Sequence, residues 1–149
     1  MNNIIWKIKS FEEISTEELY QIIKARVDVF VVEQNCPYPD LDGYDQKAIH
    51  LWAEKNNCVL AYCRIFDKNI KYKETSIGRV LTTEEGRGKL LGKQLIQYAL
   101  ETIKNRYNTE EVRISAQDYL LKFYSSFGFE DTGKKYLEDN IPHTEMVRK

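Results

Sequence analysis

The chain has 149 residues, enough for one domain with a real hydrophobic core and too few for two, so we expect residues 1–149 to form a single domain. Its 22 Lys and Arg residues almost balance its 23 Asp and Glu residues, and no long basic run occurs, which argues against nucleic-acid binding. No apolar stretch of signal-peptide or membrane-spanning length occurs either, so we expect a cytoplasmic protein without a membrane partner.

The first part of the chain predicts a strand followed by a helix. Residues 4–9 alternate in the manner of a strand. Ser15 is followed three residues later by Glu18, which is the spacing of a capping box, and apolar residues then recur at helical steps. Because prolines follow at positions 37 and 39, we expect this helix to end within residues 32–35.

The next segment, residues 33–45, carries four acidic residues and no Lys or Arg. It is not an EF-hand, because Gly43 directly follows an acid instead of occupying the sixth position of the loop. Two interpretations stay open: a solvated acidic loop, or a patch that attracts a cationic molecule. The four acids are Glu33, Asp40, Asp42 and Asp45.

The middle of the chain predicts three antiparallel strands and then a βαβ unit. The strands span residues 48–54, 57–66 and 75–82, and an asparagine-containing turn joins the first two as a hairpin. A helix from Leu91 and a strand over 111–116 follow. The crossover helix should place this last strand parallel to the strand that precedes it.

The last part predicts a short helix and two further strands. The helix begins after Ala116 and ends at Gly128, which serves as its C-cap. One strand starts at Phe129 and another spans 142–147. The complete order predicts an α/β (α+β) fold with a mixed central sheet of about six to seven strands, antiparallel except for one parallel pair, and flanked by helices.

Between the third strand and the second long helix lies a glycine-rich loop with three cationic side chains. A helix start carries about half a positive charge and free N–H groups, and glycines let an anion approach them, so the loop suits a phosphate. A plain turn before a solvated lysine face is the alternative. The loop has no Gly-Lys-Ser or Gly-Lys-Thr, and the third glycine of a dinucleotide fingerprint would fall on Leu91. The glycines are Gly86, Gly88 and Gly92, and the cations are Arg87, Lys89 and Lys93.

Residues 87–92 resemble the pyrophosphate loop of the GNAT N-acetyltransferases, which reads Arg/Gln-x-x-Gly-x-Gly/Ala. Leu90 stands where that family usually has a glycine, and it is compatible with the motif if it presents only its backbone N–H with a helical φ. A second family pattern follows, with Gln117 and Leu120 in place of Asn and Ala, and with Tyr124 before Gly128-Phe129.

The N-terminal half narrows this resemblance to the ElaA-like subgroup, whose phosphate loop often lacks the middle glycine. The matching residues are Arg26 to Gln34, Cys36-Pro-Tyr38, Asp42-Gly43, Asp45, His50 and Ile141-Pro-His143. The resemblance implies the GNAT acyl-CoA N-acyltransferase fold, whose parallel pair of strands is splayed to admit pantetheine. It also implies a set of acetyl-CoA-binding residues: Leu81, Thr82, Arg87, Gly88, Lys89, Leu90, Leu91, Gly92, Lys93 and Gln117.

The implied reaction is direct transfer of an acetyl group from acetyl-CoA to a primary amine in a ternary complex. An alkyl ammonium has a pKa near 10, so a base must remove its proton, and Glu33 and His50 are the candidates. Tyr124 matches the family tyrosine that protonates the leaving thiolate. The candidate contacts to the acceptor are Tyr38, Asp42 and Asp45.

Two other functions stay open. One is a catalytically silent acyl-CoA-binding regulator on the same fold, since fold alone never proves activity. The other is a small nucleotide-dependent oxidoreductase that would use the three glycines and Asp118 as its ribose-binding acid, although a single βαβ unit argues against it. The sequence does not identify the acceptor, nor does it distinguish a monomer from a homodimer.

The cysteines and histidines indicate no metal site. No Cys-x-x-Cys occurs, and neither histidine has a neighbouring ligand pattern. If Cys58 and Cys63 share a strand, their odd spacing places them on opposite faces. We expect both, together with Cys36, to be buried apolar residues; an acetyl-cysteine route through Cys36 is the less favoured alternative because no base is visibly paired with it.

Overall fold

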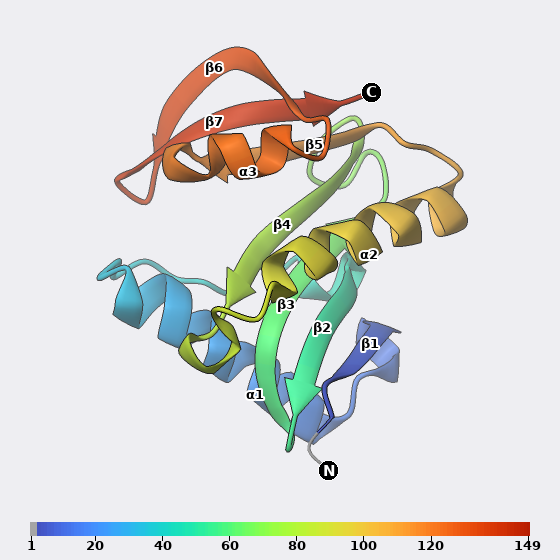
Figure 1. Cartoon of the computed structure of the whole chain (residues 1–149), viewed down its shortest axis with the longest axis vertical. Helices are drawn as coiled ribbons and strands as arrows, with labels where there is room; N and C mark the ends of the chain where they lie inside the picture. Colours follow the sequence, from blue (N-terminus) through green and yellow to red (C-terminus); the bar gives the residue numbers. More distant parts are fainter. Residues whose placement is uncertain (1–2) are drawn as a thin grey trace.

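The computed structural model describes residues 3–149, and these form a seven-stranded mixed sheet flanked by helices, as predicted (Figure 1). The strand order is β1-β2-β3-β4-β5-β7-β6. Strands β1 to β3 lie with helix α1 in the lower part of Figure 1, β5 to β7 lie with helix α3 in the upper part, and β4 runs between the two. The strands are β1 Ile5–Ser10, β2 Ile49–Lys55, β3 Cys58–Phe66, β4 Thr75–Thr82, β5 Val112–Gln117, β6 Glu130–Glu138 and β7 Ile141–Arg148.

The predicted parallel step is present between β4 and β5, and it is short. Among the described residues only two pairs join these strands, Thr75 with Val112 and Ser76 with Arg113. All other neighbouring strands pair antiparallel. Beyond Ser76 the two strands separate, which is the predicted splay. One parallel pair does not make the doubly wound sheet that a nucleotide-dependent oxidoreductase requires.

The first helix begins where the sequence indicates. Helix α1, Thr16–Arg26, is capped by Ser15, whose side chain accepts from the Glu18 backbone N–H while the Glu18 carboxylate accepts from the Ser15 backbone N–H. The chain then continues as a π-helical segment, η2, Val27–Glu33, so that the helical stretch ends within the predicted range. The sequence did not predict the wider winding, which often marks a functional site.

The remaining helical elements are short except for α2. Helix α2, Leu91–Tyr107, follows the glycine-rich loop, and α3, Leu121–Ser125, follows the 3-10 turn η5, Asp118–Leu120. Gly128 ends this region with a φ of 92°, as expected of a C-cap. The other 3-10 turns are η1 Phe11–Glu13, η3 Asp45–Lys47 and η4 Glu84–Gly86. No helix among residues 3–149 is both long and apolar enough to cross a membrane.

The sheet separates two apolar clusters. On one face α2 packs Leu95, Ile96 and Ala99 against β2 to β5. On the other face α1 packs Ile22 and Ala25 against the inner side chains of β2 to β4. Strand β4 is therefore covered on both faces, by α2 on one and by the α1 side on the other.

Two local features shape β3 and β4. The β2–β3 hairpin turns at Asn56 and Asn57, both with positive φ, as a type I′ hairpin turn requires. The β3–β4 register pairs Tyr62 with Leu81 and then Arg64 with Gly78, so the pairing shifts at a bulge that holds residues 79–80. The bulge bends β4 away from β5.

The cysteines differ in burial. Cys36 and Cys63 are buried, as expected, but Cys58 is exposed because it begins β3 beside the hairpin turn. Among the described residues, no group of three or more His, Cys, Asp or Glu side chains could hold a metal ion.

Candidate active site

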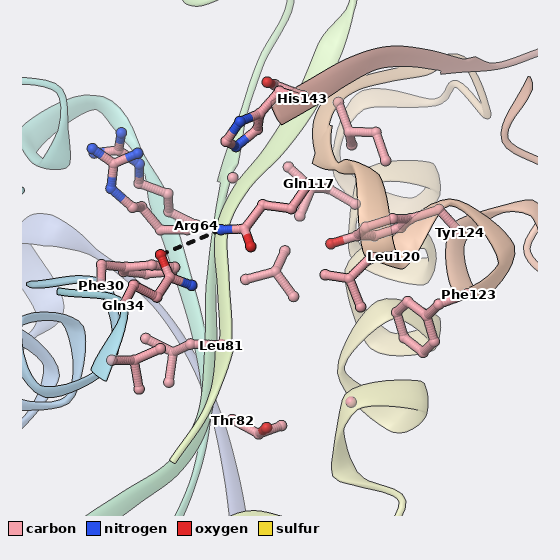
Figure 2. A pocket seen from close by; sticks show the side chains of 18 of the residues that line it. Phe30, Gln34, Arg64, Leu81, Thr82, Gln117, Leu120, Phe123, Tyr124 and His143 are labelled. Carbon is pink, nitrogen blue, oxygen red and sulfur yellow. Dashed lines mark hydrogen bonds between the residues drawn. The ribbon is translucent and has the colours of Figure 1, made fainter. Parts of the chain in front are cut away.

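A cavity of about 830 Å³ opens where β4 and β5 diverge. Its walls come from β4, β5, η2, α3, β7 and the loop before α2, and Figure 2 labels ten of the residues that line it. All but one of the predicted cofactor-binding residues lie on its wall; the exception is Lys89. The fold thus gathers residues from four distant parts of the sequence around one space.

The glycine-rich loop forms one end of this cavity. Gly88 and Leu90 both adopt left-handed conformations, with φ of 76° and 59°. The expected helical φ of Leu90 is therefore found with the opposite sign, in the region that a glycine occupies without strain. The Leu90 side chain is 77% exposed, so only its backbone belongs to the loop. The first turn of α2 contains no acidic residue, which leaves its N–H groups free of a competing carboxylate.

Gly86 fixes this loop against the sheet. A Cβ at this position would lie 2.2 Å from the backbone oxygen of Leu60, so no other residue fits without displacing β3 or the loop. The Leu60 oxygen also accepts the backbone N–H of Thr83 at 2.9 Å. The loop before α2 is therefore held directly on β3.

Arg87 and Glu33 form an ion pair across the mouth of the cavity. The Arg87 Nη2 atom lies 2.5 Å from the Glu33 carboxylate and donates to the Thr82 carbonyl at 3.0 Å. Both side chains are more than one-third exposed, and ion pairs at such exposure contribute about 0–1 kcal/mol. Arg87 is thus weakly held and available to a stronger anion such as a diphosphate.

Tyr124 reaches the cavity from α3. Its hydroxyl points toward Gln117 in Figure 2, while its ring packs edge-on against Phe123 and Phe129. The residue is only 5% exposed, and this burial raises the pKa of the phenol well above its usual value. Tyr124 therefore stays protonated at neutral pH and can donate a proton into the cavity.

Gln117 links the two sides of the cavity. Its Nε2 atom donates to the Gln34 side-chain oxygen of η2 at 3.4 Å, as the dashed line in Figure 2 shows. Leu81 and Thr82 of β4 also line the cavity. The β4 backbone here is free of β5, so its polar groups are available to a bound chain.

His50 does not line the cavity, which argues against its interpretation as a base. The ring is fully buried in β2, and its Nε2 donates to the Asp45 carbonyl at 2.9 Å. Nδ1 consequently accepts from the Tyr62 hydroxyl at 2.6 Å. Burial lowers the pKa of His50, so the ring is neutral, and its only lone pair is already used. The ring supports the loop that contains Asp45.

The acidic segment is an ion-pair network with arginines of the fold. Asp45 pairs with Arg26 at 2.6 Å and with Arg64 at 2.9 Å, and Asp42 pairs with Arg64. Burial opposes ionisation of the two carboxyls, but the guanidinium groups outweigh it and lower the pKa of each. Neither aspartate lines the cavity, so neither is a free contact for a cationic acceptor.

Tyr38, the third predicted acceptor contact, is exposed and lies near the β6–β7 turn. Its hydroxyl accepts from the Asn140 side chain at 2.8 Å, and it does not line the cavity. Cys36 does line the cavity, and its thiol donates to the Asp139 carbonyl at 3.0 Å. This contact joins the acidic segment to the end of β6.

His143 was not among the candidates from the sequence, yet it lines the cavity beside Gln117 (Figure 2). Its Nδ1 donates to the Ile141 carbonyl at 2.7 Å, which leaves the lone pair of the neutral ring on Nε2. The Glu138 carboxylate lies 3.3 Å from Nε2. The Ile141-Pro-His143 motif was the only signal of this residue in the sequence, because its placement depends on the pairing of β7 with β5.

A family model described as an acetyltransferase (GNAT) domain matches residues 12–149. The protein ElaA of Escherichia coli K12 is 40% identical over 147 residues, which cover 97% of this chain and 96% of that protein. A UPF0039 protein of Synechocystis is 37% identical over 97% of this chain and 94% of its own length.

Solved structures agree with this assignment. The crystal structure of an acyl-CoA N-acyltransferase from Pseudomonas aeruginosa superposes with a TM-score of 0.93 at 37% identity, covering 99% of this chain and 100% of that one. Escherichia coli ElaA superposes with a TM-score of 0.91 at 39% identity and the same coverage. This chain therefore belongs to the GNAT acetyltransferase family, among the relatives of ElaA, and has the acyl-CoA N-acyltransferase fold.

Proposed function

We propose that the chain transfers an acetyl group from acetyl-CoA to the primary amine of an acceptor, by direct attack in a ternary complex. One observation carries the proposal: a single cavity runs from the glycine-rich loop, through the gap between β4 and β5, to the hydroxyl of Tyr124. An elongated molecule with a diphosphate at one end and a thioester at the other would fit this cavity, with the diphosphate at the glycine-rich loop and the thioester near Tyr124. Acetyl-CoA is such a molecule.

The donor would bind by its phosphates and by its amide-containing arm. The diphosphate would rest on the N–H groups of residues 87–92, where Arg87 and Lys93 add positive charge. The pantetheine arm would lie along Leu81 and Thr82 as an added strand, because β4 has no partner there on the β5 side. The bulged backbone at residues 79–80 would offer an N–H group to the thioester oxygen.

Tyr124 is proposed as the general acid. When the amine nitrogen bonds to the acetyl carbon and the C–S bond breaks, the thiolate takes the phenolic proton. We expect Tyr124→Phe to lower kcat about 100-fold, a typical contribution of a general acid, and to leave the Kd of acetyl-CoA unchanged. Release of free thiol measures kcat, and calorimetry measures the Kd of acetyl-CoA. Equal turnover in the two proteins would remove Tyr124 from the mechanism.

His143 is proposed as the base, in preference to Glu33. His143 lines the cavity and its Nε2 atom carries the lone pair of the ring, and the Glu138 carboxylate 3.3 Å from Nε2 would pair with the imidazolium that forms when the ring accepts the ammonium proton. Glu33 lies instead beside Arg87 of the glycine-rich loop, at the end of the cavity where the diphosphate would bind. We expect His143→Gln to lower kcat/KM for the amine about 100-fold, and Glu33→Gln less than about threefold. The reverse order would assign the base to Glu33.

The decisive experiment is thiol release from acetyl-CoA in the presence of a panel of amines. We expect release with at least one amine, together with the acetylated amine as the second product. A protein that binds acetyl-CoA and releases no thiol with any amine would instead be the silent regulatory module. Tyr124→Phe serves as the control, because contaminating activity would not respond to this substitution.

A further inference from the structure

Arg64, on β3, is a buried arginine whose donors are only partly used. It is 1% exposed, its Nη1 donates to Asp42 and Asp45 at 2.8 and 2.9 Å, and its Nη2 donates to Asp42. Its Nε has no hydrogen-bond partner among residues 3–149. The Nε–H and the second Nη2–H form the edge of the guanidinium that binds a carboxylate through two parallel hydrogen bonds. This edge of Arg64 is unused by the described residues, and Arg64 lines the cavity.

A second buried donor on the neighbouring strand is also without a partner. Ser76 is 2% exposed and lines the same cavity, and its Oγ contacts no donor or acceptor in the described part of the chain. Arg64 pairs with Gly78 in the β3–β4 register, so Ser76, two residues earlier, is its diagonal neighbour. Buried polar groups are nearly always hydrogen-bonded, so these two adjacent groups without a protein partner are where the oxygens of a bound molecule would be held.

Gly78 leaves open space between these two side chains. A Cβ built on Gly78 would meet no heavy atom within 4 Å, although Gly78 sits in a paired strand directly opposite Arg64. Gly78 also lines the cavity. We call the space bounded by Arg64, Ser76 and Gly78 the Arg64 recess.

The charges around the Arg64 recess favour an anion. Three carboxylates, those of Asp40, Asp42 and Asp45, face three guanidinium groups and the ammonium of Lys71, which leaves one positive charge in excess. His50, the remaining titratable group in contact with Asp45, is neutral because it is buried. The guanidinium groups belong to Arg26, Arg64 and Arg79.

Another part of the cavity wall carries groups that suit an ammonium. Glu138 and Asp139 line it beside His143, the proposed base. Gly78 and the bulge at residues 79–80 are only about two residues apart, or about 7 Å along a strand at about 3.3 Å per residue. An acceptor that reaches both places has its amine and its anionic group separated by a few bonds.

We propose that the acceptor is an amine that also carries a carboxylate, of the amino-acid class, and that its carboxylate binds in the Arg64 recess. The carboxylate accepts from the free edge of Arg64 and from the Ser76 hydroxyl, and the amine faces the thioester at the bulge of β4. This inference rests on the proposed acetyl transfer and specifies its substrate class.

The first test compares amino acids with the amines that they yield on decarboxylation, such as lysine with cadaverine and ornithine with putrescine. With thiol release as the readout, we expect kcat/KM to be at least about 30-fold higher when the carboxylate is present, as for a buried charged hydrogen-bond pair. Equal or better use of the decarboxylated amines would overturn the inference while leaving the proposed function intact.

The second test fills the recess without touching the ion pairs of Arg64. Gly78→Val should fold, because the site is open and its φ is not positive, and a β-branched residue suits a strand. We expect this variant, and more weakly Ser76→Ala, to raise the KM for the amino acid about 10-fold or more. The KM for acetyl-CoA and the activity with the decarboxylated amine should not change. An unchanged KM for the amino acid in Gly78→Val contradicts the inference.

Calorimetry separates failure of the recess from failure of the proposed function. The amino acid is titrated into wild-type protein saturated with CoA, and then into Gly78→Val under the same conditions. If the wild-type protein binds the amino acid and Gly78→Val does not, the Arg64 recess is supported. This holds even if no amine causes thiol release, because the lack of thiol release would contradict only the proposed acetyl transfer. Absence of amino-acid binding to the wild-type protein contradicts the recess.

Discussion

Leu90 shows how a single residue can depart from a family motif while the loop keeps its shape. Its φ of 59° would be free of strain in glycine and costs a leucine about 1–2 kcal/mol. The side chain points to solvent, so the loop uses only the backbone of this residue. The sequence identified the loop and the replacement of the usual glycine by Leu90. The sign of the Leu90 φ angle depends on the path of the chain between η4 and α2, which the sequence did not predict.

Leu90→Gly should therefore leave the loop functional. Strain is relieved in the folded state, but glycine also gains freedom in the unfolded state, so we expect the free energy of unfolding to change by less than about 1 kcal/mol. The Kd of acetyl-CoA should stay within about threefold of wild type. Leu90→Val should raise that Kd at least about 10-fold, because a β-branched residue resists positive φ. Calorimetry measures the Kd of acetyl-CoA for both variants. Weaker binding by Leu90→Gly than by Leu90→Val would contradict this account.

Tyr124 permits a pH prediction at the same scale. Burial raises the pKa of its phenol above the ordinary value of about 10, so the proton-donating form persists through neutral and mildly alkaline solution. We expect kcat for thiol release to show no alkaline decline below about pH 10. If kcat of the wild-type protein declines with an apparent pKa below 10 and kcat of Tyr124→Phe does not, the assignment of Tyr124 as the general acid is contradicted. The profile is measured with a saturating amine.

At the scale of elements, Glu18 connects α1 to β1. Its carboxylate accepts from Lys7 at 2.7 Å and from Lys9 at 2.9 Å in addition to capping the helix. Burial alone would raise the pKa of Glu18, but the hydrogen bonds from Lys7, the Ser15 backbone and Lys9 outweigh it and lower the pKa to about 2. The sequence predicted the cap from local spacing. It did not predict the lysines, which come from a different element.

The lowered pKa of Glu18 predicts a loss of stability in acid. Because the folded pKa lies below the unfolded one, the contribution is complete above about pH 4.5 and is lost as the pH falls toward 2. Glu18→Gln should cost about 2 kcal/mol at pH 7 and much less near pH 2. Urea unfolding at the two pH values measures this. Glu17→Gln, on an exposed neighbour, is the matched control and should change stability by less than about 0.5 kcal/mol. Equal effects of the two substitutions would contradict the role of Glu18.

At the scale of the whole molecule, function depends on what the sheet leaves unpaired. Two residue pairs hold β4 to β5, and beyond them the strands diverge around the cavity. The proposed donor would pair with this backbone, so it should bind the folded state alone and stabilise it. The βαβ order predicted the parallel step, but it did not predict that the pairing would end after two residue pairs.

Acetyl-CoA should therefore raise the melting temperature. At 100 times its Kd, a ligand that binds only the folded state stabilises it by about 2.7 kcal/mol, which for a chain of this size is about 5–10 °C. NAD and NADP at the same concentration should have no comparable effect, because the sheet lacks a doubly wound dinucleotide site. A shift with NAD and none with acetyl-CoA would contradict the proposed function.

The sequence by itself determined the order of elements, the caps and turns, and the position of the glycine-rich loop, because these depend on residues close together in the chain. Only the tertiary structure decided which charged groups are free. Asp42 and Asp45 form ion pairs with arginines from α1 and β3. Both ring nitrogens of His50 are engaged in hydrogen bonds beneath the acidic segment, and His143 lines the cavity because β7 pairs with β5. The partners of a polar side chain come from distant segments, and local sequence does not specify them.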